Sequence, residues 1–266
     1  MINISQKSKQ IRLKSLDVFS YANRGHLPSA FSIVEILVTL YYQFMNNNPL
    51  SVTENTHDPI ILSKGHGCIS LYVILADLGF ITDHDLRSFC CKDGILGGHP
   101  TSFKIPGVEV STGSLGHGLS FATGMAITFK QKKNDRKVAV ILGDGECNEG
   151  SVWEAALSIH KHQLTNLITI IDYNKLQSYS STEEVCPLEP FKQKWQSFGF
   201  SVHEVDMINT PEQLLNTLNQ DHSSPPLIIC HTLKGLGSDI LENNLFWHHK
   251  NKVSQSQIHE LKRSIR

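Results

Sequence analysis

The sequence predicts an α/β protein with a mostly parallel sheet flanked by helices. Short apolar runs rich in β-branched residues alternate with longer segments of helical periodicity, a pattern typical of parallel sheets. The clearest unit has an apolar run at 138–142, a glycine turn, a helical segment at 152–160 and a second apolar run at 167–172. Strands joined through one helix in this way run parallel, and the helix packs on the sheet.

The other elements are assigned from the same periodicities. Helices are expected over 4–22, 31–44, 69–78, 190–198 and 211–219, with a further one that ends near Lys130. Strands are expected over 60–62, 201–205 and 227–232, and loops over 46–59, 90–107 and 178–189. The helix at 31–44 is expected to begin at a cap, Ser29 or Ser32. We expect one domain over 1–266, with an N-terminal helical extension (about 1–45) and a charged, helical C-terminal tail (about 250–266).

The composition argues against several classes of protein. Lys and Arg number 24 against 25 Asp and Glu, so the chain lacks the basic field of a nucleic-acid-binding protein. The amino terminus is polar and basic, without the apolar core of a signal peptide, and no run approaches the length of a membrane span. Six scattered cysteines lack zinc-ligand spacing, which favours reduced thiols in a cytoplasmic protein.

Two polar side chains follow the two strands of the clearest unit. Asp144 lies in a Gly-Asp-Gly turn after the first strand, and Asn174 lies thirty positions later, just past the second. Because parallel strands end at one edge of the sheet, both side chains are expected at the edge where such sheets bind ligands. Carboxylate and amide oxygens suit Mg²⁺ or Ca²⁺, and Mg²⁺ often completes its shell with phosphates. The alternative is an ordinary turn at each position.

The spacing of Gly-Asp-Gly and Asn resembles the thiamine-diphosphate motif, although Lys175 follows Asn174 where a second Asn is frequent. The segments GDGECNEGSVWEAA and DYNKLQS are similar to the amino-terminal part of transketolases, and most similar to the kind split into two chains. Further segments resemble the same family in the same order. They are the Gly-His at His26, SKGHG with His66, GHP with His99, TGSLGHG at 112–118, and TLKGLG followed by WHH at 247–249.

The resemblance implies the diphosphate-binding fold and a set of site residues. Mg²⁺, with Ca²⁺ or Mn²⁺ as substitutes, would be held by Asp144, Asn174 and the carbonyl of Leu176. Thiamine diphosphate would contact His66, Gly113, Ser114, Leu115, Gly143, Asp144, Gly145, Glu149, Asn174 and His248. His26, His66, His99 and His248 would bind sugar hydroxyls and relay protons, with His249 as the alternative to His248. His117 is given a structural role.

Glu149 matches a family glutamate at the dimer interface, and it is also an acid at a helix start, where the helix dipole favours it; both interpretations can hold together. In the family a pyrimidine-binding domain normally follows this one. We therefore expect a chain that is inactive alone and works in a heterotetramer with two copies of a C-terminal subunit. The implied reaction moves a two-carbon ketol unit from a ketose to an aldose, with free or phosphorylated sugars as substrates.

Three alternatives stay open at this point. The first is another thiamine-diphosphate-dependent carboligase, such as a deoxyxylulose-phosphate synthase or another acyloin-forming enzyme. The second is a non-catalytic assembly protein that keeps the fold. The third, a nicotinamide-binding domain, is poorly supported because no G-x-G-x-x-G follows a strand near an acidic partner.

Overall fold

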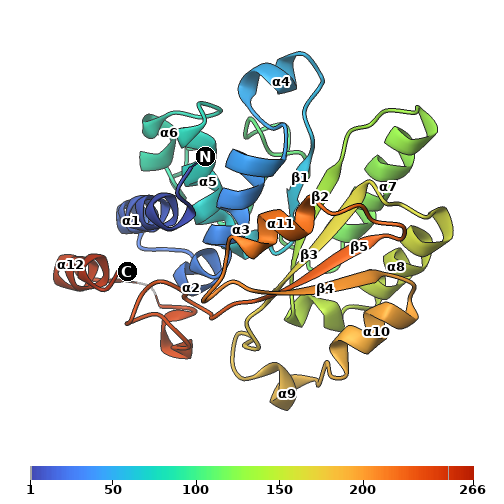
Figure 1. Ribbon diagram of the computed structural model, residues 1–266. Coiled ribbons are helices and arrows are strands. Elements are labelled where there is room, and N and C mark those ends of the chain that lie inside the picture. The colour runs from blue at the N-terminus through green and yellow to red at the C-terminus, as the bar shows by residue number, and fades with distance from the viewer. Residues whose placement is uncertain (1, 251) are drawn as a thin grey trace.

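Five short apolar runs form one fully parallel sheet in the order β1-β2-β3-β5-β4 (Figure 1). The computed structural model describes residues 2–250 and 252–266. The strands are β1 (Ile60–Leu62), β2 (Val138–Gly143), β3 (Leu167–Tyr173), β4 (Ser201–Asp206) and β5 (Pro226–His231). All five expected strands are confirmed to within a residue at either end, and so is the predicted α/β class.

Helices cover both faces of this sheet, so its central strands are buried on both sides. Alternate residues of β2 show the division: Ala139 and Ile141 join one apolar cluster, whereas Val138, Val140 and Leu142 join the other. Side chains of a strand point alternately to opposite faces, which explains the continuous apolar run without polar alternation.

One helical layer combines both ends of the chain, and the other comes from its middle. The first contains α1 (Ile4–Ala22), α2 (Leu27–Phe31), α3 (Val34–Thr39), α5 (Cys68–Asp77), α11 (Gln213–Leu218) and α12 (Gln255–Arg263). The second contains α7 (Gly118–Gln131), α8 (Gly150–His162) and α10 (Phe191–Ser197). The N-terminal helices therefore supply a large share of one core cluster.

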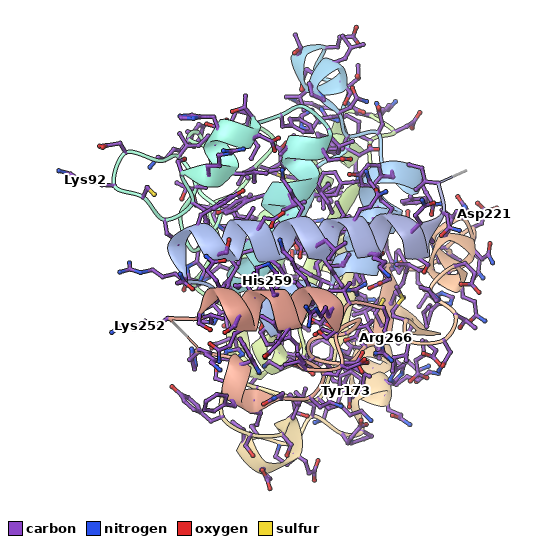
Figure 2. The ribbon with its side chains drawn as sticks, turned by 90° about the vertical axis from the view of Figure 1, so that its left-hand side faces the viewer. Lys92, Tyr173, Asp221, Lys252, His259 and Arg266 are labelled. Atoms are coloured by element: carbon purple, nitrogen blue, oxygen red, sulfur yellow. The ribbon has the colours of Figure 1, made fainter. Side chains whose placement is uncertain are left out.

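Helices α1 and α12 lie side by side, although they come from opposite ends of the sequence (Figure 2). Lys262 of α12 donates to Asp17 of α1 at 2.5 Å. Within the core, Arg12 of α1 forms a two-pronged ion pair with Glu35 of α3, at 2.7 and 2.6 Å. A planar guanidinium matches a carboxylate in this way, which fixes the orientation of α1 on α3.

The prediction of one helix over 31–44 is wrong in two respects, the residue at which the helix begins and its continuity. Helix α2 begins at Leu27, with His26 at its N-cap and Pro28 in its first turn. Neither Ser29 nor Ser32 is the N-cap of a helix there, and Ser32 is instead the C-cap residue of α2. The helical path is interrupted at Ser32 and Ile33 and resumes as α3, which ends in a π-helical turn, Leu40–Phe44. By length and composition Leu27–Phe44 could cross a membrane, but 83% of it is buried inside the fold, as in a core helix.

Among the described residues, three short α-helices lie where none was expected. They are α4 (Pro49–Thr53), α6 (Asp83–Arg87) and α9 (Thr182–Val185). Each begins at a side chain that accepts a backbone hydrogen bond: Asn48, Thr82 and Ser181. Such capping residues stabilise single turns that are too short to show a hydrophobic periodicity.

Candidate active site

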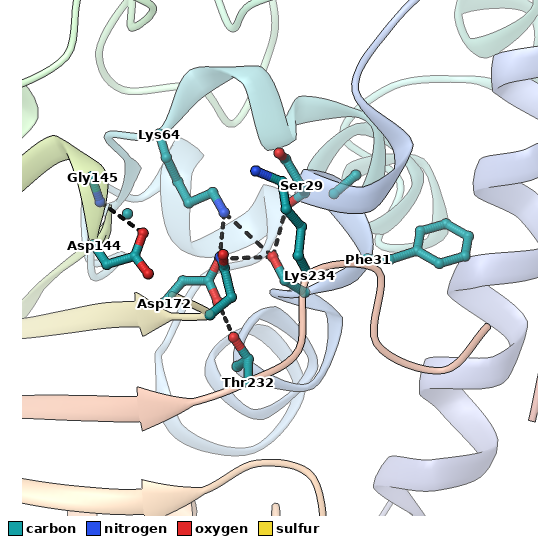
Figure 3. A network of polar contacts seen from close by, with 12 residues as sticks. Ser29, Phe31, Lys64, Asp144, Gly145, Asp172, Thr232 and Lys234 are labelled. Carbon is teal, nitrogen blue, oxygen red and sulfur yellow. Dashed lines mark hydrogen bonds and ion pairs between the residues drawn. The ribbon is translucent and has the colours of Figure 1, made fainter. Parts of the chain in front are cut away.

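The carboxyl ends of β1, β3 and β5 meet in one buried polar network (Figure 3). Lys64, two residues after β1, forms an ion pair with Asp172 near the end of β3, and both side chains are buried. Thr232, directly after β5, and Ser32, between α2 and α3, also donate hydrogen bonds to the Asp172 carboxylate. Burial alone would raise the pKa of Asp172, but Lys64 and these hydroxyls outweigh burial and hold the pKa below its ordinary value.

The same carboxylate orients Asn174. The Asn174 amide nitrogen donates to Asp172 at 2.9 Å, so its oxygen faces the other way and accepts from the backbone of Leu176 at 3.1 Å. The strands β2 and β3 pair with Gly143 opposite Asp172, and the residues that follow their ends, Asp144 and Asn174, both line one cleft. The predicted approach of Asn174 to Asp144 at one sheet edge is therefore what the register produces.

Asp144 is a buried carboxylate that lacks a cationic partner among residues 2–250 and 252–266. Its two oxygens accept from the backbone N–H groups of Gly145 at 2.7 Å and Lys175 at 2.5 Å. Burial and the nearby charge of Asp172 raise the pKa of Asp144 to about 7. A buried carboxylate in this state is stabilised in its charged form by a cation.

Lys234 holds the backbone beside this carboxylate. Its ammonium donates to the carbonyls of Leu176 and Gln177, both at 2.9 Å. Burial and the neighbouring charge of Lys64 lower the pKa of Lys234 to about 8. The carboxylate, the amide oxygen and the Leu176 carbonyl are hard oxygen donors, and Lys234 adds a positive charge beside them. This combination fits a hard divalent cation bound together with an anion such as a diphosphate.

A cleft of about 330 Å³ opens over these residues. Its lining includes His66, Leu115, Gly143, Asp144, Gly145, Glu149, Asn174, Leu176, Lys234 and His248. Glu149 precedes α8 but makes no capping hydrogen bond, and its side chain is exposed on the rim. Glu149 is the N-cap residue of α8, so its charge lies at the helix start as the dipole interpretation expects, and its exposed side chain is also available to another chain.

Four histidines cluster at one end of the cleft. The ring of His26 lies 5.8 Å from that of His66, 5.1 Å from that of His248 and 5.2 Å from that of His249, centroid to centroid. Burial lowers the pKa of His26 and His66, and burial with the charge of Lys234 lowers the pKa of His248 to about 3. For His26, His66 and His248 these shifts favour the neutral imidazole, whereas the resemblance led us to expect groups that titrate near neutrality.

The sequence matches the family described as transketolase, thiamine diphosphate binding domain, over residues 4–265. The chain belongs to the transketolase family. It is 41% identical over 251 residues to one subunit of the apulose-4-phosphate transketolase of Actinobacillus succinogenes, a match that covers 93% of this chain and 90% of that protein. It is 34% identical over 249 residues to one subunit of the 6-deoxy-6-sulfo-D-fructose transketolase of a Clostridium species, covering 93% and 90%.

Among solved structures, the transketolase of Campylobacter jejuni superposes with a TM-score of 0.89 at 28% identity, covering 99% of this chain but 43% of that one. The transketolase of Leishmania mexicana superposes with a TM-score of 0.88, and this chain covers 41% of it. The chain thus spans less than half the length of these one-chain transketolases. The predicted family, its thiamine-diphosphate-binding fold and the transferase class of enzyme are confirmed.

The structure gathers most of the predicted site residues of this transketolase domain, but not all. His26 lies beside the cleft, against His248. His248 is buried and lines the cleft, whereas His249 is exposed next to it, which favours His248 as the family histidine. Of the described residues, Gly113, Ser114 and His99 do not line the cleft. His99 is exposed, and a Cβ built on Gly113 would lie 3.1 Å from the ring of His99.

His117 is also exposed, and it lines a separate hollow. The roles of Gly113, Ser114, His99 and His117 stay predictions.

Four buried charged residues of the site were missed from the sequence: Lys64, Glu146, Asp172 and Lys234. Glu146 accepts from the Ser63 hydroxyl and from the backbone of Gly116 at 2.9 Å and Gly143 at 3.2 Å, so it ties the 112–118 turn to the end of β2. Asp172 offered a usable signal, since a carboxylate at the end of an unbroken apolar strand has to find a cation.

Replacing Lys64 with methionine should destabilise the chain by about 3–5 kcal/mol, because it leaves the buried Asp172 charge without its partner. Urea unfolding at pH 7.5 measures this change. The double variant Lys64→Met, Asp172→Asn should recover part of the loss, because the stranded charge is then gone. Lys14→Met, which removes an exposed pair with Asp83, is the matched control and should stay within about 1 kcal/mol. Equal effects of Lys64→Met and Lys14→Met would refute a special role of the buried pair.

Asp144 should make the metal-free chain less stable as the pH rises towards 7. Its folded pKa, about 7, lies above the ordinary pKa of 3.8, so the folded chain binds the proton more tightly. This stabilisation is complete below the unfolded pKa and is lost as the pH rises through about 7. Between pH 5 and 7 the free energy of unfolding should fall, relative to Asp144→Asn, by on the order of 1 kcal/mol per pH unit. Asp135→Asn, at an exposed acid, should keep the wild-type slope.

Proposed function

We propose that this chain is the diphosphate- and Mg²⁺-binding subunit of a two-chain transketolase-type enzyme. In the proposed reaction a two-carbon ketol unit passes from a ketose to an aldose. The observation that carries the proposal is the convergence of the Asp144 carboxylate, the Asn174 amide oxygen and the Leu176 carbonyl beside Lys234, within one cleft. Bound thiamine diphosphate would supply the chemistry that breaks and forms the carbon–carbon bond.

Residues of different charge would bind different parts of the ligands. Asp144, Asn174 and the Leu176 carbonyl would hold Mg²⁺, while Lys234 and His66 would face the diphosphate across the cleft. The neutral imidazoles of His26 and His248 would donate and accept hydrogen bonds to sugar hydroxyls. Because these rings are already held by the protein, a sugar would meet them in a fixed geometry.

A partner chain is supported by the rim of the cleft and by the relatives. Tyr179 and Val185 line the cleft, yet their side chains are 85% and 50% exposed. Exposed apolar side chains at the mouth of a polar cleft favour a surface that another chain covers. The relative from Actinobacillus succinogenes is named as one subunit of its enzyme, and this chain covers 90% of it. We therefore propose a heterotetramer with a C-terminal subunit that carries the pyrimidine-binding domain.

The class of sugar is proposed from the names of the relatives. One is named for apulose-4-phosphate and another for 6-deoxy-6-sulfo-D-fructose, so both names contain a ketose with an anionic group. We propose a ketose donor of this kind, with phosphate or sulfonate at the end remote from the ketol unit. A cytoplasmic location is proposed as well, because all six cysteines are free thiols.

Thiamine diphosphate with Mg²⁺ should bind tightly to a mixture of this chain with its C-terminal subunit, and weakly or not at all to the chain alone. Titration calorimetry on both samples measures this difference. Asp144→Ala should abolish binding in the mixture, because it removes the only carboxylate proposed to hold the metal, whereas Asp135→Ala should leave it unchanged. If thiamine diphosphate binds to none of the mixtures, the proposed cofactor is refuted, and the alternative of a non-catalytic assembly protein is favoured.

The mixture should also transfer a two-carbon unit from a ketose phosphate to an aldose, and the chain alone should not. Product analysis by mass spectrometry, with ketose and pyruvate offered as competing donors, distinguishes this reaction from other acyloin-forming reactions. Use of pyruvate in preference to the ketose would overturn the transketolase reaction while keeping the cofactor. Transfer at full rate by the purified chain alone would overturn the need for a partner.

A further inference from the structure

Three histidines beside the cleft bring ring nitrogen atoms close together. A ring nitrogen from each of His26, His248 and His249 lies within 4.8 Å of the other two. The rings of His248 and His249 are nearly perpendicular, with centroids 4.4 Å apart. Two of these residues belong to the proposed sugar site, but His249 has no role in it. Its exposed ring nevertheless completes the trio.

The hydrogen bond of His26 fixes which of its nitrogens is free. Its Nδ1 lies 2.9 Å from the backbone carbonyl of His248, and a carbonyl can only accept. Nδ1 therefore carries the hydrogen, and the lone pair is left on Nε2. Metal-binding histidines almost always donate their other N–H to a carbonyl, carboxylate or water in this manner. His26 already has that arrangement.

His248 supplies an independent observation. Its side chain is buried, with 4% of it exposed, and its Nδ1 has no hydrogen-bond partner within the described part of the chain. Its Nε2 lies 3.1 Å from the Ser178 hydroxyl, which can accept an N–H. A buried nitrogen without a partner costs free energy. In the tautomer whose Nε2 donates to the Ser178 hydroxyl, Nδ1 carries a lone pair that is available to a ligand.

We infer that His26, His248 and His249 form a binding site for a borderline transition-metal ion of the Zn²⁺ class, separate from the proposed Mg²⁺ site. Imidazole nitrogens select Zn²⁺, Co²⁺ or Ni²⁺, whereas the hard oxygens at Asp144 select Mg²⁺. Three histidines with an open fourth position match a known type of zinc coordination.

The geometry requires only a small closure. Zn–N bonds of about 2.0–2.1 Å in a tetrahedral site place the ligand nitrogens about 3.3 Å apart. In this structure the three histidine nitrogens lie up to 4.8 Å from one another, so they have to move closer together to bind the ion. His26 and His248 are held by their hydrogen bonds, so the exposed His249 is the ring that moves. The nearby ammonium of Lys234 opposes a cation here and weakens the site relative to one without that charge.

Occupancy of this site has a consequence that rests on the proposed function. A metal on His26 and His248 would withhold both imidazoles from sugar hydroxyls, so Zn²⁺ would inhibit the assembled enzyme while thiamine diphosphate and Mg²⁺ stay bound. The metal site itself does not depend on that function, because its residues all lie on this chain.

The test measures Zn²⁺ binding to the full chain alone by calorimetry, with the visible spectrum of bound Co²⁺ as a second readout. We expect one high-affinity site with a tetrahedral Co²⁺ spectrum. His249→Ala should weaken it at least about tenfold, and Ser178→Ala, which removes the hydrogen-bond partner of His248, by about 10- to 100-fold. His259→Ala and His162→Ala, at exposed histidines elsewhere, are the matched controls and should leave binding unchanged.

Zinc binding that survives His249→Ala unchanged, or that is lost in a control variant, would overturn the site. So would an absence of binding to the folded chain. Circular dichroism confirms that each variant is folded, and His249 is exposed, so its replacement should not disturb the core. Because neither cofactor nor partner is present in this assay, a failure of the proposed transketolase function would leave its result unaffected.

Discussion

The buried ion pair of Lys64 and Asp172 is the constraint on which the rest of the site depends. A pair of this kind adds little net stability, because desolvation of two charges offsets their attraction, but any misplacement of one charge is costly. It therefore fixes the ends of β1 and β3 against each other. The hydroxyls of Ser32 and Thr232 also donate to Asp172, so the α2–α3 junction and the end of β5 are attached to the same carboxylate. Asn174 is aimed by the same carboxylate.

Around this pair the cleft is electrostatically divided. Asp144 lies on one side with a raised pKa, and Lys234 lies on the other with a lowered one. Both shifts arise because the low dielectric of the interior disfavours each charge on its own. A ligand that brings its own cation and its own anion relieves both penalties together, whereas a neutral ligand relieves neither. This is the physical reason why a metal-bridged diphosphate suits the cleft better than a sugar alone.

Local patterns predicted what is locally determined. The strands, α1 and the meeting of Asp144 with Asn174 follow from periodicity, spacing and the geometry of parallel strands. The network around Asp172 could not be predicted in this way, because Lys64, Ser32 and Thr232 lie 108, 140 and 60 positions away. The break after α2 lies at Ser32, whose hydroxyl also donates to this distant carboxylate. The neutral state of His66 and His248 is a property of burial, which appears only when the chain is packed.

Lys234 keeps the segment after β3 in place through the carbonyls of Leu176 and Gln177. The entropy cost of ordering this loop therefore arises when the chain folds and not when a ligand binds. The loop is in this sense preorganised for its ligand. A metal ion that binds the Leu176 carbonyl meets an oxygen that is already bonded to an ammonium group, and the two lone pairs of a carbonyl allow both to be bound. Before any metal ion binds, the Lys234 ammonium thus serves as an internal cation for this loop. The loop can keep its conformation in the absence of the metal ion and of a partner chain.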